Sequence, residues 1–550
     1  MADLNLLKGK GVHVRQIIER MTLEQKVGQL FMLAFAGKDL AYAKKLVEER
    51  YVSGFYITQD NAETMAEARH MTQTLQDAAC KTGMNLPLIF SVDQEGAWGV
   101  LISETETGPG NLALGAADDT DLTAEIYGIY AKEIMASGYN VILSPCSDIN
   151  SNPDNPIIGT RAFGESVEKV SRHVAAAVKG ALENNIVCCG KHFPGHGDTG
   201  EDSHRLLPMV DRSLEDLLVQ DLVPFQTGIE AGLPMIMTSH INFPQVDPEN
   251  PATLSYTIMT KLLRERMGFE GVIVTDSMNM WGMRKYYDPA EAAIKALKAG
   301  CDIIMLSEEH YEHDQEDYAS KQAATIDGVI QAVYDGELDL SVVEKSLERI
   351  YQLRTQIAEN RSLVSVAEGN SDQKTHHKTA QEAAKKAITV IRDVQSLWPL
   401  KGKILLTGAS DPVAHGMVVN TRGLGPNEPR AAYDVFCEKF CAKYPSVEIL
   451  SFEDMNKLIR EPEALFDDVT LVCVTEDYPL PGLDYDVEQQ RKIVNDLVRL
   501  TKGRLVVLGL RSGYELRHFP DLSTYVCAYS SRACSAEALA DVASCMEHPS

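Results

Sequence analysis

One stretch of the chain concentrates side chains that can transfer protons. Residues 191–204 read Lys-His-Phe-Pro-Gly-His-Gly-Asp-Thr-Gly-Glu-Asp-Ser-His. Within it, Asp202 and His204 are two positions apart, and in an extended segment side chains at this spacing share a face. A carboxylate beside an imidazole fixes the ring tautomer and raises the ring's basicity. The pair therefore predicts a general acid/base dyad.

The same segment also allows other interpretations. Imidazoles and carboxylates are common metal ligands, and the stretch offers His192, His196, Asp198, Asp202 and His204. Their spacing fixes no coordination geometry, so a metal-dependent hydrolase stays an alternative, as does a polar surface loop without catalytic function. Our preferred interpretation needs no metal and no organic cofactor.

A rigid element must deliver these groups. The apolar run 186–190 predicts a buried strand, and the glycines and the proline that follow exclude a regular helix. We therefore expect the strand to present Lys191 and His192 at its end. The flexible loop would then carry Asp202 and His204.

The strand belongs to a longer alternation of apolar runs and helical patterns. The predicted strands are residues 28–36, 54–58, 88–92, 141–145, 186–190, 235–239, 272–275 and 302–306. The predicted helices between them include residues 62–82, 121–137, 166–184, 216–231, 259–267 and 289–299. This alternation predicts an α/β fold with a (β/α)8 TIM-like barrel.

Polar side chains follow several of these strands. They are Asp93, Asp148, Lys191, His192, His240 and Asp276. Catalytic groups of such barrels gather where the strands end, so we expect these side chains to surround one pocket. By its position alone, Asp276 is either a reacting carboxylate or a helix N-cap.

A second domain follows the barrel. After helices 318–335 and 341–360, a polar linker (362–379) and a helix (380–392) lead to strands 403–407, 447–451, 470–474, 505–510 and 524–528. The predicted division is a catalytic barrel at 1–360, a linker and helix at 361–395, and a smaller doubly wound α/β sandwich at 396–550. Its first strand lacks the glycine spacing of a dinucleotide site.

The composition of the chain limits the kinds of molecule that the protein is expected to bind. The 550 residues carry a formal net charge of −27, which disfavours nucleic acid and acidic membrane surfaces. Of eleven cysteines, six lie in or directly next to predicted buried strands: Cys146, Cys188, Cys189, Cys301, Cys473 and Cys527. No apolar run has the length of a signal core or a membrane span. We expect a reduced, cytoplasmic protein, a monomer or homodimer, with a small substrate.

The proton-transfer segment resembles a known family. Residues 191–199 followed by Asp-Ser-His resemble the signature of the β-N-acetylglucosaminidase branch of glycoside hydrolase family 3. Four further segments are similar to motifs of two-domain members: 17–30, 92–96 (Val-Asp-Gln-Glu-Gly), 155–164 and 274–278 (Val-Thr-Asp-Ser-Met). The second-domain segments 480–482 and 513–516 are similar as well.

The resemblance implies a retaining exo-β-N-acetylglucosaminidase that removes terminal β-linked N-acetylglucosamine from peptidoglycan or chitin fragments. Asp276 would be the nucleophile, and His204, held by Asp202, the acid/base group. The residues expected to bind the sugar are Asp93, Arg161, Lys191 and His192. Asp148 is expected to orient one of these cations.

The turn after Asp93 departs from the family pattern Asp-Gln-Glu-Gly-Gly-Arg-Val-x-Arg. Ala97, Trp98 and Leu101 stand where the second glycine and the two arginines are usual, which removes bidentate donors. A catalytically silent sugar-binding homologue therefore stays open. A histidine acid/base also avoids a second anion beside an incoming phosphate, so a family-3 β-glycoside phosphorylase, or another β-glycosidase, stays open too.

Overall fold

A computed structural model describes residues 12–58, 60–83, 86–96, 102, 104–200, 207–307, 315–363, 373–409, 431–444, 446–461, 469–476 and 487–544. The described chain begins with helices α1 (Val12–Glu19) and α2 (Leu23–Gly28). A capping box starts α2, because the Thr22 hydroxyl accepts the Gln25 N–H (3.3 Å) and the Gln25 side chain accepts the Thr22 N–H (3.0 Å).

Within the described residues, eight parallel strands form the first sheet, in the order β7-β6-β5-β4-β3-β2-β1-β8. They are β1 (Phe31–Leu33), β2 (Gly54–Tyr56), β3 (Ile89–Val92), β4 (Val141–Ile142), β5 (Val187–Phe193), β6 (Met235–Thr238), β7 (Val272–Val274) and β8 (Ile304–Leu306). The ring closes between β7 and β8, where Val274 pairs with Ile303 and the Thr275 N–H donates to the Ile303 carbonyl (2.9 Å). The predicted barrel is confirmed.

All eight barrel strands differ from the predicted bounds by at least one residue, and the first and fifth strands differ most. The first was expected over 28–36, but Gly28 is the last residue of α2 and the strand spans only Phe31–Leu33. The fifth was expected to end at residue 190, but pairing of Phe193 with Thr238 extends β5 by three residues. Lys191 and His192 are therefore held inside a strand.

The helices surround the sheet. They include α3 (Ala41–Arg50), α4 (Met65–Lys81), α6 (Thr120–Ala136), α7 (Val167–Glu183), α11 (Pro289–Ala299), α12 (Gln315–Tyr334) and α13 (Leu340–Leu363). The predicted helix 216–231 is two helices, α8 (Leu214–Val219) and α9 (Val223–Glu230), because Pro224 lacks an N–H and favours a helix start. The predicted helix 259–267 lies largely within a π-helix, η4 (Thr257–Arg266).

A second sheet of six strands follows in the described part of the chain, ordered β11-β10-β12-β13-β14-β9. The strands are β9 (Thr389–Asp393), β10 (Lys403–Gly408), β11 (Val447–Ile449), β12 (Val469–Thr475), β13 (Leu505–Gly509) and β14 (Thr524–Cys527). Helices α16 (Ala432–Lys443) and α19 (Ala533–Ser544) cover one face, and α17 (Phe452–Arg460) and α18 (Val487–Thr501) the other. The domain is the predicted doubly wound α/β sandwich, with β9 as an antiparallel edge strand.

The segment between the domains differs from the prediction. Helix α14 (Gln373–Ala387) begins inside the stretch expected to be a linker, because Ala380, Ala383, Ala384 and Ala387 form one buried face at helical spacing. The helix expected over 380–392 is wrong beyond Ala387. Residues 389–391 are Thr-Val-Ile, and their β-branched side chains favour the strand β9 that pairs with β14.

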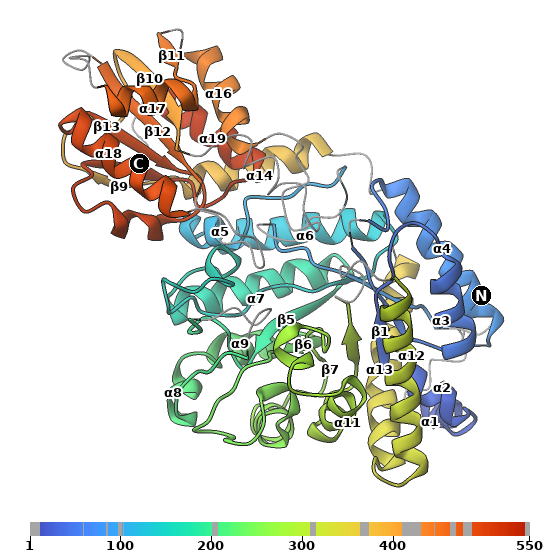
Figure 1. Ribbon diagram of the computed structural model, residues 1–550. Helices are drawn as coiled ribbons and strands as arrows, with labels where there is room; N and C mark the ends of the chain where they lie inside the picture. The colour runs from blue at the N-terminus through green and yellow to red at the C-terminus, as the bar shows by residue number, and fades with distance from the viewer. Residues whose placement is uncertain are drawn as a thin grey trace.

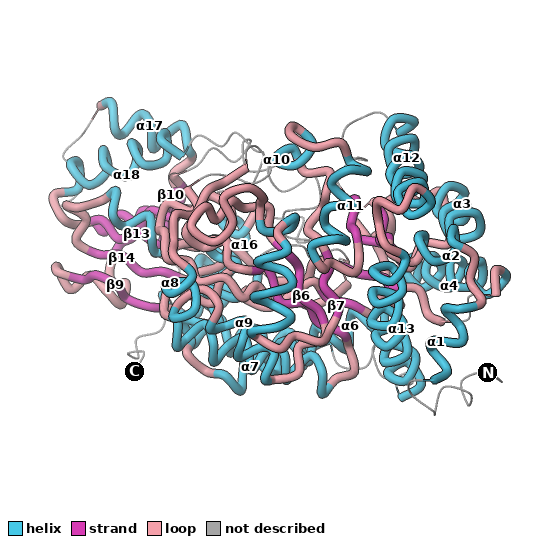
Figure 2. Tube along the Cα trace, turned by 90° about the horizontal axis from the view of Figure 1, so that it is seen from below, coloured by secondary structure: helices cyan, strands magenta, loops and turns pink. Residues whose placement is uncertain are grey.

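Helix α14 lies between the two domains (Figure 1). It packs on α5 (Asn111–Ala117) and α6 of the barrel and on α19 of the second domain. Cys534 and Ala538 of α19 belong to the same continuous apolar core as the barrel strands. In Figure 2, β9, β13 and β14 lie at the opposite end of the molecule from α12 and α13. The second domain is thus joined to the barrel by apolar packing.

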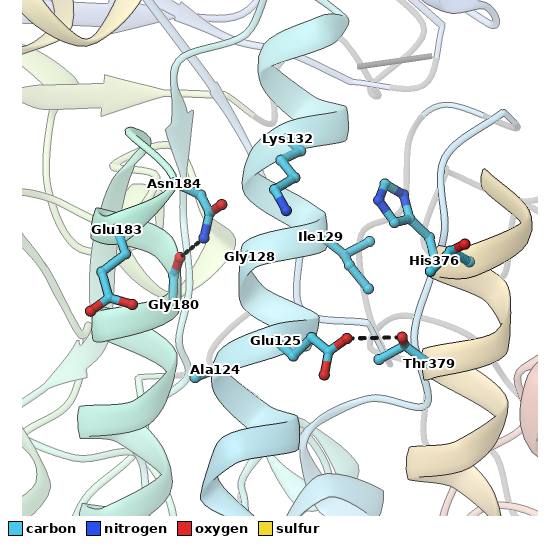
Figure 3. A pocket seen from close by; sticks show the side chains of 11 residues that line it. Ala124, Glu125, Gly128, Ile129, Lys132, Gly180, Glu183, Asn184, His376 and Thr379 are labelled. Carbon is cyan, nitrogen blue, oxygen red and sulfur yellow. Dashed lines mark hydrogen bonds between the residues drawn. The ribbon is translucent and has the colours of Figure 1, made fainter. Parts of the chain in front are cut away.

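A cavity of about 290 Å³ lies between α6, α7 and α14 (Figure 3). Its wall includes Lys132, Glu183 and His376, and Glu125 accepts a hydrogen bond from the Thr379 hydroxyl (3.0 Å). The lining residues come from the outer helices, and none of the strand-end groups singled out in the sequence is among them. This cavity is therefore separate from the predicted catalytic face.

Candidate active site

The turn after β3 is tied to β5 by charge. Asp93 directly follows Val92, and its carboxylate accepts from the Lys191 ammonium (2.5 Å) and from the Tyr56 hydroxyl (2.6 Å). Lys191 lies inside β5 and is 2% exposed, whereas the Asp93 side chain is 14% exposed. The two predicted sugar-binding residues are therefore brought together, with Asp93 the more accessible of the two.

Glu95 completes this network, and sequence reasoning did not single it out. Its buried carboxylate accepts two parallel hydrogen bonds from Arg161 (2.8 and 2.9 Å) and lies 2.6 Å from the Lys191 ammonium. Burial alone would raise the pKa of Glu95, but the charges and hydrogen bonds of Arg161 and Lys191 outweigh burial and hold the pKa well below its usual range. Two acids and two bases thus alternate in a buried, neutral network.

His192 extends the network through Asp148. Its Nδ1 lies 2.8 Å from the Asp148 carboxylate, and its Nε2 lies 3.2 Å from Nη2 of Arg161. A guanidinium only donates, so Nε2 of His192 is the acceptor. Nδ1 therefore carries the ring proton and donates a hydrogen bond to the Asp148 carboxylate. Asp148 also accepts the backbone N–H of His196 (2.7 Å). Asp148 was expected to orient Lys191 or Arg161, and its observed partner in the site is His192 instead.

The described members of the predicted metal set do not converge on one point. Asp198 pairs with Arg212 (2.9 Å), and His196 Nδ1 lies 2.9 Å from the Thr199 hydroxyl. Burial lowers the pKa of His196 to about 4, so the ring is neutral at neutral pH. His192 instead faces Asp148 and Arg161. The side chains of His192, His196 and Asp198 thus each have separate hydrogen-bond partners, which does not favour their binding one metal ion together.

A buried trio has its ligand atoms within 4.8 Å of one another, namely Cys146, Asp148 and His192. Burial and the Asp148 carboxylate raise the pKa of the Cys146 thiol, and the thiol donates to Asp148 (3.1 Å). Cys146 and Asp148 thus form a hydrogen-bonded support for His192.

Asp276 lies just past the end of β7. Its Oδ1 accepts the Ser277 N–H (2.8 Å), and its own N–H approaches the Thr238 hydroxyl of β6 (3.4 Å). The next helix, α10, spans Trp281–Arg284, so Asp276 does not cap it. The interpretation of Asp276 as an N-cap is therefore wrong.

The carboxylates of Asp276 and Asp93 act on a common neighbour inside the barrel. Burial raises the pKa of the Cys189 thiol on β5, Lys191 lowers it, and the negative charges of Asp93 and Asp276 raise it further. The carboxylates that follow β3 and β7 thus both act on a thiol of β5. His240, just past β6, lies 2.9 Å from the Ser277 carbonyl and so contacts the backbone that follows Asp276.

The structure therefore gathers Asp93, Arg161, Lys191 and His192 in one network, while Asp276 follows β7, which is separated from β5 by β6. The predicted dyad, Asp202 and His204, lies outside the described residues, as do Ala97, Trp98 and Leu101. Glu95 was missed because an acid in a turn is usually a solvated surface residue. Its position beside Asp93 in the segment 92–96 was the available signal.

A parallel barrel with charged side chains meeting past its strand ends is the architecture of a barrel enzyme that binds a small polar substrate. Comparison with known proteins then defines the family. The model of the glycosyl hydrolase family 3 N-terminal domain matches residues 22–353, more than half of the chain. The chain belongs to glycoside hydrolase family 3.

Individual relatives agree with this assignment. The chain is 32% identical over 367 residues to the β-hexosaminidase A of Pseudoalteromonas piscicida, covering 64% of this chain and 61% of that protein. It is 32% identical over 281 residues to a β-hexosaminidase of Idiomarina loihiensis, covering 50% of this chain and 82% of the relative. A solved family 3 β-N-acetylglucosaminidase from Paenibacillus sp. str. FPU-7 matches with a TM-score of 0.82 and 30% identity, covering 95% of this chain and 97% of that chain.

Proposed function

We propose that the protein is a retaining exo-β-N-acetylglucosaminidase. The observation that carries this proposal is the buried network of Asp93, Lys191, Glu95 and Arg161, with Asp276 at the end of β7 in the same barrel, on a fold that matches a solved β-N-acetylglucosaminidase over almost its full length. The names of the two bacterial relatives support the same activity. The substrates we propose are peptidoglycan or chitin fragments that end in β-linked N-acetylglucosamine.

In this network, we distinguish a residue that can contact the sugar from residues that hold it in position. Asp93 is its more exposed member, while Glu95 and Lys191 are 0% and 2% exposed. A sugar hydroxyl can therefore donate to Asp93, whose orientation Lys191 and Tyr56 fix. Glu95 in turn holds Lys191 and Arg161, so its contribution to binding acts through these cations.

The proposed chemistry has two steps. A carboxylate oxygen of Asp276 attacks the anomeric carbon, the bond from that carbon to the leaving oxygen breaks, and His204 gives its proton to the leaving oxygen. In the second step, neutral His204 takes a proton from water, whose oxygen displaces Asp276 and restores the free carboxylate. Asp202 would hold the imidazole in the orientation that both steps need. An imidazole with an unperturbed pKa of about 6.5 can serve in both protonation states near neutral pH.

A cytoplasmic role in the recycling of peptidoglycan is part of this proposal. The ten cysteines among the described residues are all free thiols, which fits a reducing compartment. Within those residues, no helix combines the length and the apolar character needed to span a membrane.

One substrate panel tests the proposal. Aryl β-N-acetylglucosaminide and aryl β-glucoside are each offered with water alone and with added phosphate, and the products are followed by NMR. We expect free N-acetylglucosamine, released first as the β-anomer. Accumulation of a sugar 1-phosphate would instead show a phosphorylase, cleavage of the glucoside alone another β-glycosidase, and binding without turnover a silent homologue. Loss of activity with a chelator, restored by added metal, would favour the metal-dependent hydrolase.

A further inference from the structure

An arginine of the second domain reaches the sugar-binding turn of the barrel. Arg532 lies between β14 and α19 and is 2% exposed. Its backbone is fixed at both sides: its N–H donates to the Ser530 hydroxyl (3.1 Å), and its carbonyl accepts the N–H groups of Ser535 and Ala536 (3.0 Å each). Because α19 packs into the core shared with the barrel, the position of this arginine is set by the docking of the second domain.

The Arg532 side chain donates a hydrogen bond to the main chain of the turn. Its Nε donates to the Gly96 carbonyl at 2.5 Å. Gly96 has a φ of +76°, and a Cβ built there would lie 2.5 Å from the Tyr130 hydroxyl and 2.8 Å from the Gly110 Cα. The end of the turn is therefore enclosed between barrel residues on one side and a guanidinium from the second domain on the other.

The residue before Gly96 is Glu95, which holds both Lys191 and Arg161. A shift of the Gly96 carbonyl would move the Glu95 backbone and, through its carboxylate, both cations. We infer that Arg532 is a positioning residue for substrate binding, through which the second domain fixes the geometry of the barrel's sugar-binding turn. The inference concerns the same site as the proposed function and rests on it where substrate is used as the readout.

The test compares three variants in the full chain. Arg532→Met removes the donor but keeps an unbranched stem, and Arg532→Lys keeps the charge and one donor group. The matched control is Arg392→Met, because Arg392 also donates to backbone carbonyls, those of Phe519, Pro520 and Leu522, but only within the second domain. If R532M does not fold, the comparison of R532K with the control decides the question.

Kinetics with an aryl β-N-acetylglucosaminide give the first readout. A hydrogen bond from a charged donor contributes about 10- to 100-fold in an equilibrium constant. We expect R532M to raise KM by about tenfold or more with a smaller change in kcat, R532K to recover part of the loss, and R392M to keep wild-type KM. An unchanged KM in R532M, or an equal rise in R392M, would overturn the inference.

Hydrogen–deuterium exchange gives a second readout that needs no substrate. We expect the amides of residues 93–96 to exchange faster in R532M than in wild type or R392M, because the enclosed end of the turn loses its fixed contact. Equal exchange in all three proteins would overturn the inference. A wild-type protein that turns over no N-acetylglucosaminide would instead refute the proposed function, while the exchange comparison would still decide the role of Arg532.

Discussion

Replacing Glu95 by glutamine tests how far the site depends on its buried network. The substitution keeps the size of the side chain but removes the charge that faces Arg161 and Lys191. The glutamine oxygen can still accept, but its amide group would point a donor at cations that only donate. Breaking a buried ion pair by removing one partner costs about 3–5 kcal/mol. That is a large share of the roughly 5–15 kcal/mol typical of a folded domain.

The assay is urea unfolding followed by circular dichroism, with Glu337→Gln as the matched control. Glu337 pairs with Lys298 at 3.0 Å, but the two side chains are 60% and 42% exposed. An exposed pair contributes about 0–1 kcal/mol. We therefore expect a large loss of stability in E95Q and a small one in E337Q at neutral pH.

The pH dependence follows from the lowered pKa of Glu95. A carboxyl group whose pKa is lower in the folded than in the unfolded state, where it is about 4.3, stabilises the fold above that value. The contribution is lost as the pH falls toward the folded pKa. The gap between wild type and E95Q should accordingly be widest near neutral pH and narrow below about pH 4. A gap no larger than that of E337Q, or one that widens in acid, would refute the reasoning.

Two further predictions concern the Asp202–His204 dyad and the contacts between the two domains. His204→Ala should lower kcat/KM on a natural disaccharide by about 10²–10⁴-fold and on an activated aryl glycoside by much less, because the aryl group leaves without protonation; equal losses in the two assays would contradict the acid role. His377→Gln should lower the thermal midpoint near pH 6 by the equivalent of about 1 kcal/mol or less, since the ring is partly exposed. Its hydrogen bonds to Glu106 and Glu537 raise the pKa of His377 to about 10, so this stabilisation is complete below about pH 6.5 and disappears as the pH passes 10; a difference that persists above pH 10 would contradict this linkage.

The barrel was predictable because its strands are short apolar runs separated by amphipathic helices. Because catalytic groups of such barrels follow the strands, the sequence also predicted that Asp93, Lys191, His192 and Asp276 share one face. The pairing of Glu95 with Arg161 was not predictable, because the two residues are distant in sequence and meet only when the barrel closes. The contact between Arg532 of the second domain and Gly96 of the barrel has no local sequence signal either, because these two residues are also distant in sequence.

The segment after the barrel was predicted incorrectly for a different reason. A polar composition and a nearby glycine favoured a linker over 362–379, yet the alanine stripe of α14 already carried the helical period. The strand β9 was not recognised because only Ile388, and no glycine or proline, separates its first residue, Thr389, from that helix. The side chains of β9 are largely exposed and the strand lies at the edge of the sheet, so its sequence does not alternate between apolar and polar residues.

Covalent trapping tests most directly whether Asp276 forms a bond to the sugar. The protein is incubated with an activated N-acetylglucosaminyl fluoride that carries a second fluorine on the ring, which slows the second step, and is then digested for mass spectrometry. We predict one added sugar on the peptide that contains Asp276, and none in the Asp276→Asn variant, which should also lose about 10⁴-fold or more in kcat. Label on another carboxylate such as Asp93, or wild-type turnover by Asp276→Asn, would contradict the account.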